Sequence, residues 1–140
     1  MTVRWFEALC LSVLSSFSCA GQTLQVQPAQ VMTDQTAEIH AIGLAPRAPE
    51  VIRAELVDGE GHPWSSEAEL VADDSGAVDL AIQAPVKGSY RSAFAMGLLW
   101  SMTPAEKGAT MYRPPAEFAP QSITLHLLQG GKEAASAQLQ

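Results

Sequence analysis

Three histidines, His40, His62 and His126, are the side chains of this 140-residue chain that could serve as bases or metal ligands near neutral pH. None of them has a Cys, Asp or His at the spacing of a metal-binding motif. His40 and His126 lie in stretches where apolar and polar residues alternate, at positions expected on an outer face, and His62 lies in a turn before a proline. We interpret all three as solvated structural histidines.

Nucleophiles and paired acids give no stronger signal. Serine hydrolases need a Gly-x-Ser-x-Gly elbow with a histidine and an acid, and this pentapeptide is missing from the sequence. Residues 73–75 resemble part of an oxygen-rich cation loop, but an Asp-capped type I turn explains them better. Glu67 and Glu69 fall on one face of one strand, whereas a glycosidase pair must flank its substrate. We therefore predict no catalytic residue, no metal site and no cofactor in this chain.

The first twenty residues differ from the rest. An apolar stretch over residues 8–17 follows one early cation, and Ser18 and Ala20 stand at −3 and −1 of a possible cleavage site before Gly21. The stretch is shorter than the roughly 20 apolar residues that span a bilayer as a helix. We expect residues 1–20 to be a secretory signal peptide, which would make the mature chain secreted or periplasmic.

Two other interpretations of this segment stay open. A mis-assigned start would put the domain start near Thr23 and the chain in the cytoplasm. Lipidation at Cys19 would anchor the chain, although the residues before it lack the Leu of a bacterial lipobox. Both cysteines, Cys10 and Cys19, lie in this segment, so a cleaved chain would have no disulfide, thiol nucleophile or cysteine metal site.

The charge of the chain narrows the choice of partner. Eight Lys and Arg stand against fifteen Asp and Glu, which gives a formal net charge of −7. The basic residues are scattered, whereas binding to nucleic-acid phosphates needs them clustered. We expect no nucleic-acid partner and no transmembrane segment.

From Thr23 onward, apolar and polar residues alternate in short bursts. The bursts are residues 23–27, 37–44, 51–57, 67–72, 77–82, 122–128 and 133–140. Such alternation is typical of strands with one buried and one wet face. The turns "DGEG" and "QGGK" are short enough to close hairpins. We predict an all-β fold, an antiparallel β-sandwich of about seven strands that forms a single domain over residues 23–140.

Residues 88–120 break this alternation, and they begin with the stretch "GSYRSAFAMGLLWSM" at 88–102. In an extended chain the adjacent side chains of Leu98, Leu99 and Trp100 could not all face inward, because successive side chains point to opposite sides. The run therefore either fills the end of the sandwich as core or forms part of a docking surface.

This stretch closely resembles the signature of the N-terminal domain of the acyl-CoA thioester hydrolase / bile acid-CoA:amino acid N-acyltransferase family. The likeness extends from about Leu24 to Gln140. The residues that carry the motif are Gly88, Ser89, Tyr90, Met96, Gly97, Leu98, Trp100, Ser101 and Met102. The family commonly has an acidic residue just before the Met-Gly-Leu run, where this chain has Ala-Phe-Ala at 93–95.

The resemblance implies an immunoglobulin-like sandwich that precedes an α/β-hydrolase domain, which carries the nucleophile, the acid and the histidine. Such enzymes cleave acyl-CoA thioesters or pass the acyl group to an amino acid. This sequence stops at Gln140, where the sandwich would end, so we expect the hydrolase domain to be missing or separate. We expect residues 96–102 to turn at the end of the sandwich and pack against that domain.

The alternative function is a stand-alone secreted, non-catalytic β-sandwich binding protein. An acidic surface is a poor receptor for the phosphates of coenzyme A unless Arg91, Lys107 and Arg113 converge in the irregular segment.

Overall fold

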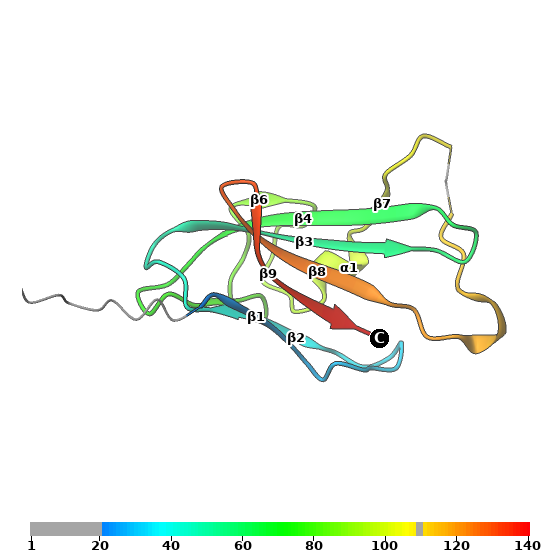
Figure 1. Cartoon of the computed structure of the whole chain (residues 1–140), viewed down its shortest axis with the longest axis horizontal. Helices are drawn as coiled ribbons and strands as arrows, with labels where there is room; N and C mark the ends of the chain where they lie inside the picture. Colours follow the sequence, from blue (N-terminus) through cyan, green and yellow to red (C-terminus); the bar gives the residue numbers. More distant parts are fainter. Residues whose placement is uncertain (1–20, 109–110) are drawn as a thin grey trace, which may run out of the picture.

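Two antiparallel β-sheets lie face to face in the computed structural model, which describes residues 21–108 and 111–140 (Figure 1). The smaller sheet has the order β1-β2-β5. Its strands are β1 (Thr23–Gln27), β2 (Glu38–Ile42) and β5 (Val78–Asp79). The expectations for residues 1–20, a signal peptide, a shifted start or a lipid anchor at Cys19, lie outside the described residues.

The larger sheet has the order β6-β4-β3-β8-β9, and β7 also pairs with β4. Its strands are β3 (Pro49–Val57), β4 (Pro63–Val71), β6 (Lys87–Gly88), β7 (Thr103–Pro104), β8 (Ile123–Gln129) and β9 (Lys132–Leu139). Each of the seven predicted bursts overlaps a strand, and the two short strands β6 and β7 belong to the irregular segment. The all-β prediction is confirmed: the fold is an immunoglobulin-like antiparallel sandwich.

Both predicted hairpin turns are present. Gly130 and Gly131 join β8 to β9 with φ values of 57° and 80°, a left-handed conformation that glycine adopts at little cost. The β3–β4 hairpin closes at Asp58, whose N–H donates to the carbonyl oxygen of His62 (2.9 Å). The expected Asp cap at 73–76 is also confirmed, because the Asp73 carboxylate accepts the N–H of Ser75 (2.8 Å).

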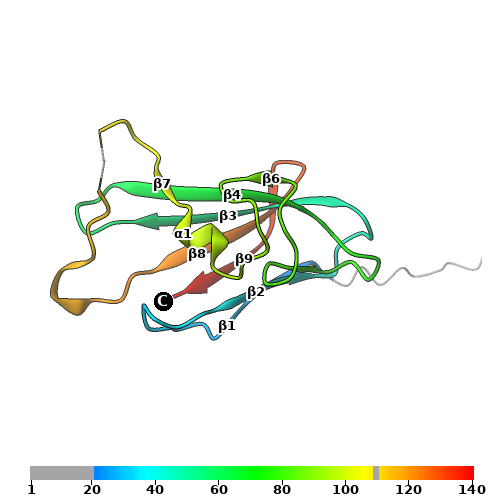
Figure 2. The same ribbon diagram turned by 180° about the vertical axis from the view of Figure 1, so that it is seen from behind.

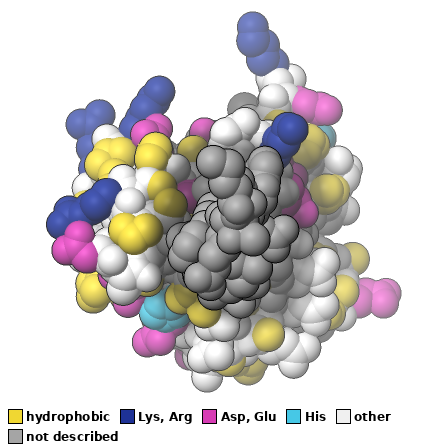
Figure 3. All heavy atoms as spheres, turned by 60° about the vertical axis from the view of Figure 1, so that its left-hand side comes forward, with side chains coloured by type: hydrophobic (Ala, Val, Ile, Leu, Met, Phe, Trp, Pro, Cys, Tyr) yellow, Lys and Arg dark blue, Asp and Glu magenta, His cyan; other side chains and the backbone are white. Residues whose placement is uncertain are grey.

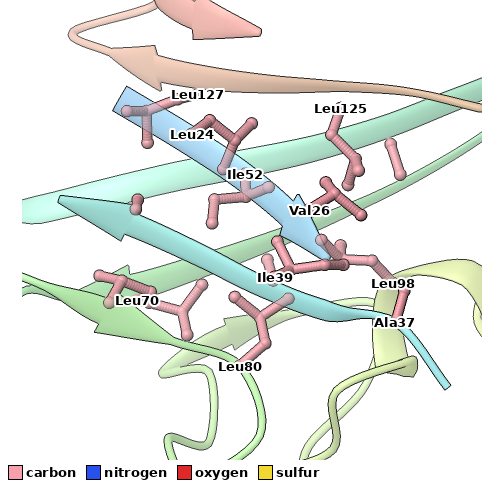
Figure 4. Packing of buried hydrophobic residues seen from close by; sticks show 14 of the residues in the cluster. Leu24, Val26, Ala37, Ile39, Ile52, Leu70, Leu80, Leu98, Leu125 and Leu127 are labelled. Carbon is pink, nitrogen blue, oxygen red and sulfur yellow. The ribbon is translucent and has the colours of Figure 1, made fainter. Parts of the chain in front are cut away.

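The core lies between the inner faces of the sheets, as the alternation predicts. Leu24, Val26 and Ile39 of the small sheet face Ile52, Leu125 and Leu127 of the large sheet (Figure 4). The alternation over residues 77–82 predicts Ile82 on the same inner face as Val78 and Leu80, and this prediction is wrong: Ile82 is 76% exposed. Strand β5 ends at Asp79, whose carboxylate accepts the N–H of Ala81 (2.8 Å) and closes a turn, so the alternation stops before Ile82.

Two short helical turns interrupt the irregular segment: α1 (Gly97–Trp100) and the 3-10 turn η1 (Ala116–Phe118). Figure 2, which views the molecule from behind, shows α1 on the side of the sandwich next to β3 and β4, which it contacts. The three-stranded sheet is narrower than the sheet that it covers, and α1 adds apolar side chains to the core there. Among the described residues, no helix has both the length and the apolarity of a membrane span.

Candidate functional site

The motif segment is fastened to the outer edge of β4 at two places. At its start, Gly88 pairs with Ala68, and Ser89 continues the ladder past the end of β6. The Ser89 N–H donates to the Glu67 carbonyl oxygen (2.8 Å), and the Ser89 Oγ accepts the Glu67 N–H (3.0 Å). At its end, strand β7 pairs with β4 at Trp64. The motif thus covers a strand edge whose unpaired backbone groups would otherwise be open to pairing with another chain.

Both motif glycines are required by close packing. A Cβ at Gly88, where φ is 149°, would lie 2.8 Å from the Ala68 Cα. A Cβ at Gly97 would lie 2.5 Å from Cδ2 and 2.8 Å from Cζ of Tyr90. The Tyr90 ring therefore packs directly on the backbone of α1, and burial raises the pKa of its hydroxyl to about 12. Tyr90 acts here as a neutral packing residue.

The apolar run forms a helical turn rather than an extended chain. The N–H of Trp100 donates to the carbonyl oxygen of Met96 (3.0 Å), and that of Ser101 donates to Gly97 (3.1 Å). Because the backbone is helical, adjacent side chains point in three directions. Leu98 is fully buried, Leu99 is partly buried, and Trp100 is 74% exposed. The run therefore contributes Leu98 to the core and Trp100 to the surface.

Polar contacts hold the helical turn in place. The Leu98 carbonyl oxygen accepts the Ser66 hydroxyl of β4 (2.5 Å), and Met96 Sδ accepts the N–H of Ala37 (3.3 Å) just before β2. Within the described residues the buried Ser101 Oγ has no hydrogen-bond partner. Met102 is partly buried against the core. Helix α1 is therefore held on β4 of the larger sheet, and Met96, just before it, contacts the residue before β2 of the smaller sheet.

Trp100 forms the centre of an exposed aromatic surface. Its ring meets that of Phe94 edge to face at 5.2 Å, and Phe94 is itself 39% exposed. Beside Trp100 lies a groove with a volume of about 250 Å³, which we call the Trp100 groove. It is lined by Leu56, Trp64, Leu99, Trp100, Met102 and Tyr112. Helix α1, the end of the β3–β4 hairpin and the 111–113 segment thus contribute to one apolar surface.

The polar atoms of two lining aromatic residues are bonded outside the groove. Trp64 Nε1 donates to Asp58 Oδ2 (3.1 Å), and the Tyr112 hydroxyl donates to Gln121 Oε1 (2.9 Å). Burial would raise the pKa of Asp58, but N–H donors from His62, Trp64 and Glu60 outweigh it and lower the pKa to about 2. Asp58 is therefore ionised at neutral pH, and its carboxylate holds the Trp64 indole by a hydrogen bond. We assign it no role as a general acid or base.

Sequence reasoning singled out Leu99, Trp100 and Met102 but missed Leu56, Trp64 and Tyr112. Leu56 and Trp64 face each other across the β3–β4 pair, and Tyr112 comes from a proline-rich segment without strand or helix pattern. The signal that could have found Trp64 is its position six residues after the turn residue Asp58. Nothing local to Tyr112 predicts its contact with Trp64, whose ring lies 6.1 Å away.

The histidines have closer acidic neighbours than the sequence predicted. Each lies within 4 Å of two carboxylates. The pairs are Glu38 and Asp79 for His40, Asp58 and Glu60 for His62, and Glu55 and Glu133 for His126. Some of these carboxylates lie on neighbouring strands, so spacing along the chain could not reveal them. Within the described part of the chain, no group of three or more His, Cys, Asp or Glu could hold a metal ion.

The remaining charged groups form surface pairs. Arg53 donates to Glu67 (2.8 Å), which places Glu67 in a cross-strand ion pair rather than in a catalytic dyad. Arg113, one of the three cations that could have met coenzyme A, pairs with Glu60 (3.6 Å). On the face drawn in Figure 3, outside the grey residues, Lys and Arg side chains stand among acidic and apolar ones without forming a basic surface.

Comparison with known proteins agrees with the motif. Residues 34–140 match the family model described as the acyl-CoA thioester hydrolase/BAAT N-terminal region. Acyl-coenzyme A thioesterase 1 of Homo sapiens is 31% identical over 109 residues, 77% of this chain and 26% of that protein. Acyl-coenzyme A thioesterase 6 of Mus musculus is 39% identical over 83 residues (59% and 20%). Bile acid-CoA:amino acid N-acyltransferase of Mus musculus is 35% identical over 81 residues (58% and 19%).

The chain thus spans about a fifth to a quarter of the length of these relatives. The family model covers most of the chain, including the complete motif segment and the strands of the larger sheet. The chain belongs to the acyl-CoA thioester hydrolase/BAAT N-terminal region family.

Proposed function

We propose that this chain is the accessory β-sandwich module of an acyl-CoA thioester hydrolase or acyltransferase. It acts by docking on an α/β-hydrolase domain, in the same polypeptide or in another one, and that domain performs the chemistry. The docking surface is the aromatic surface around Trp100 and Phe94. Residues of the family motif that are not used inside the sandwich are presented there.

This proposal rests on one observation: most motif residues are packed or bonded inside the sandwich, whereas Trp100 is exposed. Gly88, Ser89, Tyr90, Gly97 and Leu98 are all occupied by packing or by bonds to β4. Trp100 follows directly on Leu98 and Leu99 yet is 74% exposed. Large exposed aromatic groups are enriched at the centres of protein–protein interfaces, where burial gives the largest gain. The relatives named above, all of them acyl-CoA enzymes by name, indicate the kind of partner.

A chimera tests this proposal. Residues 22–140, which contain β1, Met32 and the region matched by the family model, replace the N-terminal region of human acyl-coenzyme A thioesterase 1, and kcat/KM for an acyl-CoA substrate is measured. We expect the chimera to hydrolyse acyl-CoA and Trp100→Ser to reduce kcat/KM by about 30-fold, the equivalent of one interface hot spot of about 2 kcal/mol. The isolated chain should show no hydrolysis.

Met32→Ser is the matched control, since Met32 is 69% exposed but lies outside the motif, between β1 and β2. It should leave kcat/KM within about twofold, as surface substitutions usually do. A folded chimera that is inactive, or one in which both variants behave alike, would contradict docking through Trp100 and favour a stand-alone binding protein. The secretory signal remains a prediction that N-terminal sequencing of the native product can test.

A further inference from the structure

The lining of the Trp100 groove is mainly apolar. Its lining comes from six apolar or aromatic residues with a smaller polar part, and Trp64 and Tyr112 use their side-chain polar atoms on Asp58 and Gln121. A peptide segment that entered such a groove would bury N–H and C=O groups with too few partners, which is costly. An unbranched hydrocarbon chain has no such groups, so its entry leaves no hydrogen bond unmade.

The size of the groove fits part of such a chain. Pockets that enclose a whole small ligand usually measure about 300–1,000 Å³. The Trp100 groove, at about 250 Å³, falls just below this range. A water molecule occupies about 30 Å³ and a methylene group is of similar size, so the groove has room for roughly eight methylene groups.

We propose that the Trp100 groove binds a segment of the acyl chain of an acyl-CoA substrate. This inference rests on the proposed function, which brings the groove next to the hydrolase domain. The sandwich then supplies part of the chain-length specificity of the enzyme. Leu56, Leu99 and Met102 contact the methylene groups, and Trp100 lies at the boundary between the groove and the docking surface.

The test measures binding by the full chain alone, without any hydrolase domain. Because the chain has a formal net charge of −7, the probes are uncharged N-acetylcysteamine thioesters of butanoic, hexanoic, octanoic and decanoic acid. Binding is followed by calorimetry and by tryptophan fluorescence, since two of the three tryptophans, Trp64 and Trp100, line the groove. We expect the affinity to rise by up to about fourfold for each added methylene, the equivalent of about 0.8 kcal/mol, and to level off when the groove is full.

Two variants locate the binding. Met102→Trp fills the groove and should weaken binding of the octanoyl probe by at least tenfold, while Met32→Trp should not. If Met102→Trp fails to fold, Trp100→Ser removes one wall without touching the core and should also weaken binding. Equal affinity for butanoyl and octanoyl probes, or unchanged binding by a folded groove variant, would overturn the inference.

The two proposals fail separately. An active chimera that depends on Trp100, combined with a chain that binds no alkyl probe, keeps the docking proposal and means that a partner side chain fills the groove. Chain-length-dependent binding combined with an inactive chimera would support the acyl-chain site in the Trp100 groove and contradict the docking proposal.

Discussion

At the scale of single residues, two opposing effects act on a substitution of Gly97: helix propensity and close packing against Tyr90. Glycine in a helix interior costs about 1 kcal/mol relative to alanine; Gly97 is the first residue of α1, so helix propensity favours Gly97→Ala by at most this amount. The Tyr90 ring opposes it, because a Cβ would lie 2.5 Å from its Cδ2 atom. The ring packs against the core and cannot withdraw cheaply.

We therefore expect Gly97→Ala to destabilise the protein by about 1–3 kcal/mol, the usual cost of overpacking, despite the gain in propensity. Urea unfolding followed by circular dichroism measures the difference. Gly21→Ala is the control and should be neutral, because a Cβ at Gly21 meets nothing within 4 Å. A stabilised Gly97→Ala variant would mean that Tyr90 does not lie on α1.

Glu50 gives a second residue-scale prediction. It is fully buried in β3; Gln129 donates to its Oε1 (3.2 Å), and its Oε2 has no partner within the described residues. Burial raises the pKa of Glu50 above 4.5, more than the Gln129 hydrogen bond lowers it. The folded state therefore binds this proton more tightly than the unfolded state, and stability from this group is present at low pH and lost as pH rises through the raised pKa.

Glu50→Gln should consequently be more stable than the parent at neutral pH, with the advantage shrinking toward pH 4, where the parent carboxyl is protonated. Urea unfolding of both proteins across this range tests the sign. Gln129→Ala should enlarge the neutral-pH penalty of the parent. A Glu50→Gln variant that is less stable at every pH would mean that Glu50 is paired when ionised.

At the scale of elements, strands were predictable and the motif helix was not. Period-two alternation is a local signal, and it located β1, β2, β3, β4, β8 and β9. It overextended β5 because the Asp79 side chain closes a turn there. Helix α1 has four residues and no side-chain cap, so only tertiary contacts such as Ser66 with Leu98 stabilise it. The Trp100 groove could not be predicted for the same reason, since its walls meet only in the folded chain.

Ser66→Ala tests this dependence of α1 on β4. The substitution leaves the Leu98 carbonyl oxygen without its hydroxyl donor in a buried place, which should cost about 1–3 kcal/mol. Hydrogen exchange should show faster exchange of the Trp100 and Ser101 amides, which bond within this turn. Ser65→Ala, on the opposite face of β4, is the control and should change neither. An unchanged exchange rate in Ser66→Ala would show that packing of Leu98 alone holds the helix.

At the scale of the whole molecule, net charge and the exposed aromatic surface act against each other. The formal net charge of −7 keeps copies of the chain apart, while Trp100 and Phe94 favour their association. Repulsion weakens with salt, since the Debye length falls from about 30 Å at 0.01 M to about 10 Å at 0.1 M ionic strength. Apolar contacts are not screened in this way. The isolated chain should therefore associate more as salt is added.

Trp100→Ser should abolish this salt-induced association and leave unfolding within about 0.5 kcal/mol of the parent, because Trp100 is 74% exposed. Sedimentation velocity at both ionic strengths, with urea unfolding alongside, measures the two effects. Leu98→Ser, two residues away but fully buried, should instead unfold the domain. Met32→Ser controls for the loss of any exposed apolar side chain. If Met32→Ser suppresses association as well as Trp100→Ser does, association is a general property of the apolar surface, and Trp100 has no special role in docking.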